Sequence, residues 1–179
     1  LAQWIADLVP GPESWRNCVR RLAAGYGPNV LRVAGDLEAA RAGMELARQL
    51  WATGSDPAGL LDPGRLLELE ASRYRDECRF DDALARLTEA EAVGRAKGRI
   101  LVNKGTTLEA MGDYEGAVEA LREAERHIDR ASDPRLWYKQ RGNLAVNYSL
   151  TDRFQEAAKL VREIRAVVEG LGDQDEVLR

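Results

Sequence analysis

Apolar residues recur along the chain at the three- and four-residue spacing of helices, in segments divided by short polar turns. Four of these turns share one form, in which an aromatic residue or Leu is followed three positions later by Ala. Because the same turn recurs, the pattern predicts an all-α fold made of repeated helix-turn-helix units. The marker positions are Leu37, Phe80, Tyr114 and Phe154, and the alanines are Ala40, Ala83, Ala117 and Ala157.

The markers lie 43, 34 and 40 residues apart, so two of the intervals carry extra residues. The first excess falls in 52–64, where Gly and Pro predict a loop or a short extra turn. We interpret the second as lengthened helices with a break at Asp133-Pro134. Trp51 and Trp137 lie beside these irregular segments and are expected to pack the helix ends.

Small residues fall where the helices of a pair would approach closely. Ala71, Gly105 and Ala145 occupy this position on the first helices. Gly35 and Gly112 are placed to end first helices in a left-handed conformation. We expect Asp36, Asp113 and Asp152 to cap the following helices, and Tyr74, Leu108 and Tyr148 to fill the space between neighbouring helices.

The 34-residue interval and the segment "ILVNKGTTLEAMGDYEGAVEALREAERHI" resemble the tetratricopeptide repeat (TPR) family. The resemblance implies a right-handed α-α superhelix of about four repeats plus a short N-terminal helix, with the first helix of each pair lining an inner binding face. The chain is also similar to repeat regions of bacterial regulatory and signalling proteins. We interpret 1–179 as one domain, and as a piece of a longer protein. Its expected parts are a leading helix (1–12), repeats at 13–51, 64–97, 98–131 and 135–170, and the start of a further or capping helix (171–179).

Pro28 departs from the repeat pattern, because the family places a small residue there. Either a proline kinks the first helix or the helix restarts at this residue, and we favour the kink.

The residues expected on the inner face of the first helices are mostly polar. Solvation explains a long charged side chain at such a position as well as binding does. The candidates for partner binding are Asn29, Arg32, Arg65, Arg75, Arg99, Asn103, Thr106, Lys139 and Asn143, and the same face includes Glu68, Ser72, Glu109, Val146 and Ser149.

Asn103 and Asn143 occupy equivalent positions of consecutive repeats, where some peptide-binding relatives hold a ligand backbone with Asn. An amide donates and accepts at once, which suits a peptide group. Arg99 and Lys139 lie one helical turn earlier and could grip an acidic peptide or its terminal carboxylate. We expect alanine at both Asn positions to weaken a peptide partner by more than about 1 kcal/mol.

The family's binding mode for chaperone tails needs a Lys and an Asn in the first repeat of its clamp. Here those positions hold Glu68 and Ser72. We therefore reject a chaperone-tail clamp for this chain.

Composition narrows the classes of function. A net charge of −4 gives no reason to expect nucleic acid as a direct partner, and no apolar run approaches a membrane span. Cys18 and Cys78 have no metal-ligand spacing, and we interpret them as reduced, partly buried thiols of a cytoplasmic protein. His127 is placed as a surface residue near a helix end. We expect no catalysis, cofactor or metal.

Two functions follow as hypotheses. The first is a scaffold that binds a protein or peptide on the inner face. The second is a ligand-sensing or dimerising arm of a bacterial transcriptional or signalling regulator, whose effector domain lies outside this chain. We also expect apolar residues of 154–168 to be exposed on the last repeat, and to be covered by residues 171–179, by a second copy in a homodimer, or by sequence outside this chain.

Overall fold

The computed structural model describes residues 13–52 and 62–175, so the expected leading helix over 1–12 lies outside the described residues. Every regular element within these ranges is a helix, and the predicted all-α fold is confirmed. The chain divides into two compact units, unit 1 (Leu1–Ala96) and unit 2 (Lys97–Arg179), which are described separately.

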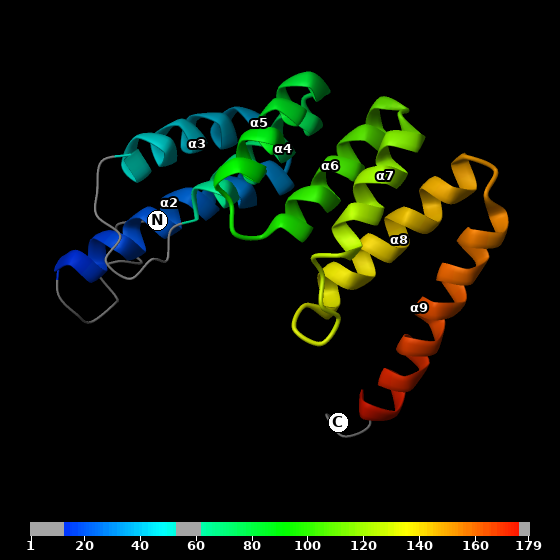
Figure 1. Ribbon diagram of the computed structural model, residues 1–179. Helices are drawn as coiled ribbons and strands as arrows, with labels where there is room; N and C mark the ends of the chain where they lie inside the picture. The colour runs from blue at the N-terminus through cyan, green and yellow to red at the C-terminus, as the bar shows by residue number, and fades with distance from the viewer. Residues whose placement is uncertain (1–12, 53–61, 176–179) are drawn as a thin grey trace. The chain divides into compact units, whose positions relative to one another are not determined.

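Unit 1 contains two antiparallel helix pairs (Figure 1). Helix α2 (Glu13–Val33) pairs with α3 (Leu37–Ala52), and α4 (Pro63–Asp76) pairs with α5 (Phe80–Val93). Helix α4 also contacts both α2 and α3, so the second pair is stacked on the first.

Unit 2 repeats this arrangement. Helix α6 (Lys97–Met111) pairs with α7 (Tyr114–Glu125), α8 (Pro134–Leu150) pairs with α9 (Phe154–Asp175), and α8 contacts both α6 and α7. Residues 171–175 continue α9. The prediction that a further helix starts at 171 is therefore wrong.

The predicted close contacts between paired helices are present. Ala40, Ala83 and Ala117 are fully buried, and Ala157 nearly so. A Cβ added to Gly105 would lie 2.7 Å from Cγ of Leu121, so only glycine fits between α6 and α7 at this separation.

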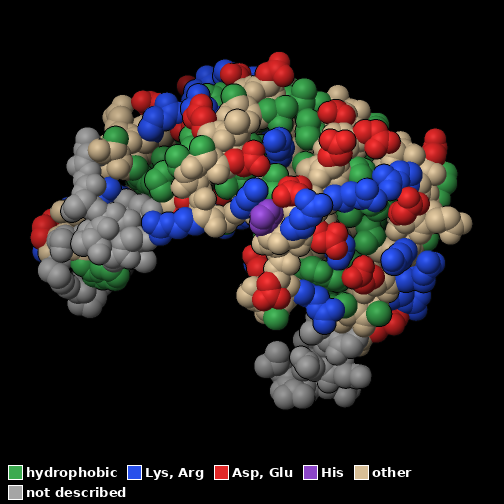
Figure 2. All heavy atoms as spheres, in the orientation of Figure 1, with side chains coloured by type: hydrophobic (Ala, Val, Ile, Leu, Met, Phe, Trp, Pro, Cys, Tyr) green, Lys and Arg blue, Asp and Glu red, His purple; other side chains and the backbone are tan. Residues whose placement is uncertain are grey.

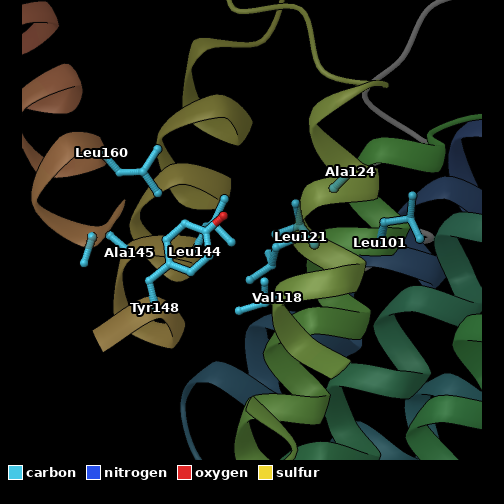
Figure 3. Packing of buried hydrophobic residues seen from close by; sticks show 10 residues of the cluster. Leu101, Val118, Leu121, Ala124, Leu144, Ala145, Tyr148 and Leu160 are labelled. Carbon is cyan, nitrogen blue, oxygen red and sulfur yellow. The ribbon is translucent and has the colours of Figure 1, made fainter. Parts of the chain in front are cut away.

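The core of unit 2 is one continuous apolar cluster that links all four of its helices. Figure 3 shows Leu144 and Tyr148 of α8 lying between Leu160 of α9 and the α7 side chains Val118 and Leu121. Tyr148 is buried, as predicted, while Tyr74 and Leu108 are half-buried. None of the three points fully into water.

Pro28 lies inside α2, which runs from Glu13 to Val33 without a break. The alternative of a restarted helix is therefore wrong. The pyrrolidine ring is accommodated from the opposite helix, because a Cβ on Gly43 of α3 would lie 2.8 Å from Cγ of Pro28. The small residue at this contact is therefore Gly43 on α3, and not the residue at position 28 of α2.

The turns that end the first helices are of two kinds. Gly35 and Gly112 have φ of +88° and +84°, which confirms their left-handed conformation. The following aspartates cap the next helices, since Oδ1 of Asp36 accepts from the amide of Ala39 and Oδ1 of Asp113 from the amide of Gly116.

Asp152 differs from this prediction. It has φ of +57° and fills the left-handed position itself, as Cys78 does with φ of +58°. The expectation that Asp152 caps α9 is therefore wrong, because its equivalent in the other turns is the glycine and not the aspartate.

The extra residues before the last repeat lie mainly in the non-helical connection 126–133 and do not lengthen α7, which has only 12 residues. Our interpretation of lengthened helices is therefore wrong for α7, whereas α8, with 17 residues, is longer than α6, with 15. Helix α8 does start at Pro134, and the side chain of Asp133 accepts from the amide of Leu136.

The tryptophans beside the irregular segments pack helix ends, as expected. Nε1 of Trp51 donates to the carbonyl of Arg21 at 2.6 Å, and Trp137 is buried. The two cysteines differ from our interpretation, because Cys18 is fully buried and Cys78 is exposed.

Candidate partner-binding face

Three polar contacts join the first helices of unit 2 and form what we call the polar ladder. Nζ of Lys139 donates to Oδ1 of Asn103 at 3.1 Å. Nδ2 of Asn143 donates to Oγ1 of Thr106 at 3.0 Å. The third contact, at 2.7 Å, runs from Nδ2 of Asn147 on α8 to Oε2 of Glu109 on α6.

The spacing of the polar ladder follows from helix geometry. Its members advance by three residues along α6 (103, 106, 109) and by four along α8 (139, 143, 147). Rows three and four residues apart are the ridges and grooves that interdigitate when two helices pack. Four of the predicted residues of unit 2 therefore come together, but they bind one another.

This pairing changes the expected role of the two asparagines. Asn103 is buried and its carbonyl oxygen holds Lys139. Asn143 is half-buried, and its side-chain oxygen Oδ1 takes no part in the contact with Thr106. Of the two amides, Asn143 is therefore the better placed to meet a ligand.

The exposed face of α8 beside the polar ladder combines one charge with apolar surface. Lys139, Asn143, Val146 and Leu150 are spaced i, i+4, i+7 and i+11, which puts them on one helix face. Val146 and Leu150 are each 48% exposed, and Lys139 is also exposed. We call these four residues the α8 row.

In unit 1 the equivalent contacts between first helices are charged or aromatic. Arg32 of α2 forms an ion pair with Asp76 of α4, and its Nε donates to Oδ1 of Asn29 at 3.0 Å. The guanidinium of Arg65 lies 5.9 Å from the ring centre of Tyr26, a cation–π distance.

Arg75 is the least compensated of the predicted cations in unit 1. It is half-buried, and its ion pair with Asp76 is long at 4.0 Å. Burial lowers the pKa of Arg75, Asp76 opposes that shift, and the nearby charge of Arg32 adds to it. In unit 2 Arg99, which was predicted to act together with Lys139, is half-buried on α6.

Two inner-face residues are less accessible than predicted. Glu68 is fully buried and lies 3.3 Å from Nη1 of Arg65. The hydroxyl of Ser72 donates to the carbonyl of Glu68. The expectation that Glu68 is accessible on the inner face is therefore wrong.

Sequence reasoning missed Asn147, Tyr26 and Asp76. Asn147 could have been found, because it follows Lys139 and Asn143 at four-residue intervals. Nothing local marks Tyr26 or Asp76, since their partners come from a helix more than 35 residues away.

The described part of the chain gives few signs of other chemistry. Over residues 13–52 and 62–175 no three His, Cys, Asp or Glu side chains gather as metal ligands, and no helix is both long and apolar enough to cross a membrane. His127 is exposed after α7, with Nε2 3.3 Å from Glu123. Hydrogen bonding to His127 lowers the pKa of Glu123, against the effect of desolvation.

No protein-family model matches the chain, and no curated protein matches it. The resemblance to tetratricopeptide repeats therefore depends on the residues themselves.

Proposed function

We propose that this chain is a tetratricopeptide-repeat scaffold that binds a partner polypeptide along the first helices, with its repeats following a right-handed superhelix. The α8 row carries the proposal. Apolar side chains beside a lysine and a half-buried amide suit an extended segment that offers a backbone amide, an apolar side chain and a carboxylate. The left-handed turns and the buried alanines support the repeat assignment.

The expected ligand is a short peptide with an acidic residue near an apolar one. Lys139 would pair with the carboxylate, Val146 and Leu150 would contact the apolar side chain, and Asn143 would accept from a backbone amide. Binding by such a surface needs no cofactor.

Selection of peptides from a random library on the 179-residue chain, followed by calorimetry with Val146→Asp, tests the proposal. A charge in the middle of the α8 row should weaken the selected peptides at least about tenfold, because an apolar contact is replaced by an unpaired charge. Gln155→Asp adds the same charge on α9 and is the matched control. Equal affinity of both variants would exclude the α8 row as the binding surface.

Alanine at Asn103 and Asn143 is a less direct test, because it removes two contacts of the polar ladder. Thermal unfolding of this double variant separates loss of binding from loss of fold. Asn143→Ala alone should account for most of the lost affinity.

A second candidate function, the dimerising or sensing arm of a bacterial regulator, is favoured by α9. Phe154, Val161 and Val168 are 60%, 55% and 53% exposed and recur every seven residues, a spacing typical of helices that associate. Light scattering on the wild type and on Val161→Glu checks this. If the wild type is a monomer at all concentrations, dimerisation is excluded and the scaffold remains as the proposed function.

A further inference from the structure

A cleft of about 530 Å³ lies in unit 1, where the end of α3 and the start of α4 meet side chains of α2 and α5. We call it the α3–α4 cleft. Its apolar wall is formed by Trp51 and Ala52 of α3 and by Pro63, Leu66 and Leu67 of α4. The volume lies within the range of roughly 300–1,000 Å³ that is typical of pockets for small molecules.

The apolar wall is fixed by contacts within unit 1. The indole of Trp51 is held at its Nε1, which donates to the carbonyl of Arg21. Its ring also packs closely on α2, because a Cβ added to Gly25 would lie 2.5 Å from Cζ2 of Trp51. Leu66 is buried in a core cluster of the unit. The wall is therefore formed without a ligand, as in most small-molecule sites.

Unit 2 shows why this space is open in unit 1. The second helix pairs of the two units align with an offset of 74 residues. At three positions of the cleft lining, unit 2 has a buried apolar side chain where unit 1 has a smaller or a charged residue. These positions are Pro63 against Trp137, Glu70 against Leu144, and Arg86 against Leu160.

Unit 2 does have a cleft of about 470 Å³ in the related groove between α7, α8 and α9. That cleft is lined mainly by charged side chains, which are Arg122, Arg141, Lys159, Glu125, Glu156 and Glu163. A wide apolar wall in this groove is therefore a property of unit 1 and not of the repeat.

The charged side chains that line the α3–α4 cleft are already paired. Nη1 of Arg86 lies 2.6 Å from Oε2 of Glu89, and Nη2 of Arg48 lies 2.6 Å from Oε1 of Glu70. Arg21 donates to two main-chain carbonyls at the end of α3, at 3.1 and 3.3 Å, where the helix dipole is negative. This pairing favours a neutral ligand over an ion.

The groups beside the cleft are balanced as well. Glu77 accepts from Nη2 of Arg41 at 3.1 Å and from Nη1 of Arg73 at 2.7 Å. Burial acts to raise the pKa of Glu77, but the hydrogen bonds from Arg73 and Arg41 outweigh it and lower the pKa. Four arginines on this flank are matched by four carboxylates. They are Arg41, Arg48, Arg73 and Arg79 with Glu45, Glu70, Glu77 and Asp82.

One acceptor in the cleft lining has no hydrogen bond. Glu70 is 1% exposed, and its Oε1 accepts from both Nε and Nη2 of Arg48. Within the described ranges, Oε2 of Glu70 has no partner. A buried carboxylate oxygen without a donor is costly. The side chain of Arg48 is 51% exposed and can shift to admit a donor from a ligand.

We propose that the α3–α4 cleft binds a neutral, apolar ring compound that carries one hydrogen-bond donor. The ring would lie on the apolar wall, and its N–H or hydroxyl group would donate to Oε2 of Glu70. An ammonium group suits the cleft less well, because Arg48 already neutralises this carboxylate. The site is independent of the α8 row, so either proposal can fail without the other.

Indole and benzofuran test the proposal on the 179-residue chain. The two compounds share one bicyclic shape, and only indole has an N–H donor. Binding is followed by NMR titration of the backbone amides. Indole should shift the amides of the cleft lining and bind about tenfold more tightly than benzofuran, because a hydrogen bond to a carboxylate is a strong one.

Three variants assign the binding to the cleft. Glu70→Gln should abolish the preference for indole and leave benzofuran unchanged, because the glutamine oxygen will face Arg48 and its NH₂ group will replace Oε2. Glu89→Gln is the matched control at a carboxylate that is already paired, and it should keep the preference. Leu67→Arg introduces the residue that unit 2 has at this position. It should weaken both compounds at least about tenfold, because it places a charge in the apolar wall.

Circular dichroism establishes that each variant is folded. The proposal is overturned if indole does not shift the amides of the cleft, or if wild type binds indole and benzofuran equally. It is also overturned if a folded Glu70→Gln variant keeps the preference, or if a folded Leu67→Arg variant binds both compounds as wild type does. If Glu70→Gln does not fold, the comparison of the two compounds on wild type and the Leu67→Arg variant still decide.

Discussion

Units 1 and 2 share one framework. Tyr74, Arg79 and Phe80 recur 74 residues later as Tyr148, Arg153 and Phe154. The guanidinium of Arg79 lies 4.5 Å from the ring centre of Tyr74, and that of Arg153 lies 4.3 Å from that of Tyr148. The second helix pair of each unit is therefore closed by the same Arg–Tyr contact.

The units differ in the polar residues that join their first helices. Unit 1 uses an ion pair and an Arg–Tyr contact, whereas every contact of the polar ladder in unit 2 includes an asparagine amide. Figure 2 shows that acidic and basic side chains are otherwise interspersed on the face in view. The two units therefore share the residues that pack their helices together and differ in the polar residues that join their first helices.

The largest expected effect comes from the close helix contacts. In unit 1 the glycine, Gly43, lies on the second helix of its pair, and in unit 2 the glycine, Gly105, lies on the first. Gly43→Ala and Gly105→Ala should each lower the free energy of unfolding by roughly 1–3 kcal/mol, because the new methyl group overlaps Pro28 or Leu121. Pro28→Ala should rescue Gly43→Ala, giving a coupling that chemical denaturation can measure.

Gly142→Ala is the control for these substitutions. Its Cβ would meet no atom within 4 Å, so the change should be neutral or stabilising through helix propensity. Equal losses at Gly142 and Gly105 would contradict the packing explanation.

The next effect concerns the left-handed turns. Gly112→Ala should destabilise the chain by about 1 kcal/mol, whereas Asp152→Gly should stabilise it by a similar or smaller amount, because an L-residue is strained at positive φ. Thermal unfolding of both variants measures the difference. A loss of stability with Asp152→Gly would show that the aspartate has another role.

A smaller effect is expected in how salt changes the coupling energies of the contacts between first helices in the two units. Double-mutant cycles should give about 0.5–1 kcal/mol for Arg32 with Asp76 and for Asn143 with Thr106. Added sodium chloride should reduce the first coupling and leave the second unchanged, because salt screens charges and not neutral hydrogen bonds. Equal salt sensitivity would contradict the assigned contacts.

The smallest effect is on acid stability. The pKa of Glu77 is lower in the folded chain than its ordinary value of 4.5. Its stabilisation is therefore complete above that pH and is lost as the pH falls through 4.5 toward the folded pKa. Glu77→Gln should flatten the decline of stability between about pH 5 and pH 3. Glu156→Gln in unit 2 should flatten it less, because Glu156 is more exposed.

The helix pairs were predictable because their signals are local. Gly35 and Gly112 indicate left-handed turns, and the four spaced alanines indicate close approach, wherever the rest of the chain lies. Asp152 was assigned wrongly because its turn replaces glycine by another residue. The sequence could have shown this, because Asp152 and Cys78 lie two residues before the markers Phe154 and Phe80, as Gly112 and Gly35 lie two residues before Tyr114 and Leu37.

The candidate site was predictable only in part. Spacing placed Asn103 and Asn143 on the first helices, and they lie there. That Asn103 would be buried under Lys139 could not be predicted, because side chains that interdigitate depend on the register of two helices some 36 residues apart.

The sequence by itself determined the helices, their turns and the small residues between them, since each depends on backbone conformation or volume within one repeat. Only the tertiary structure decided which polar groups pair and which stay exposed. Packing between helices brings distant residues within hydrogen-bond reach, and those short-range contacts leave no periodic trace in the chain. The α8 row is a product of that second step.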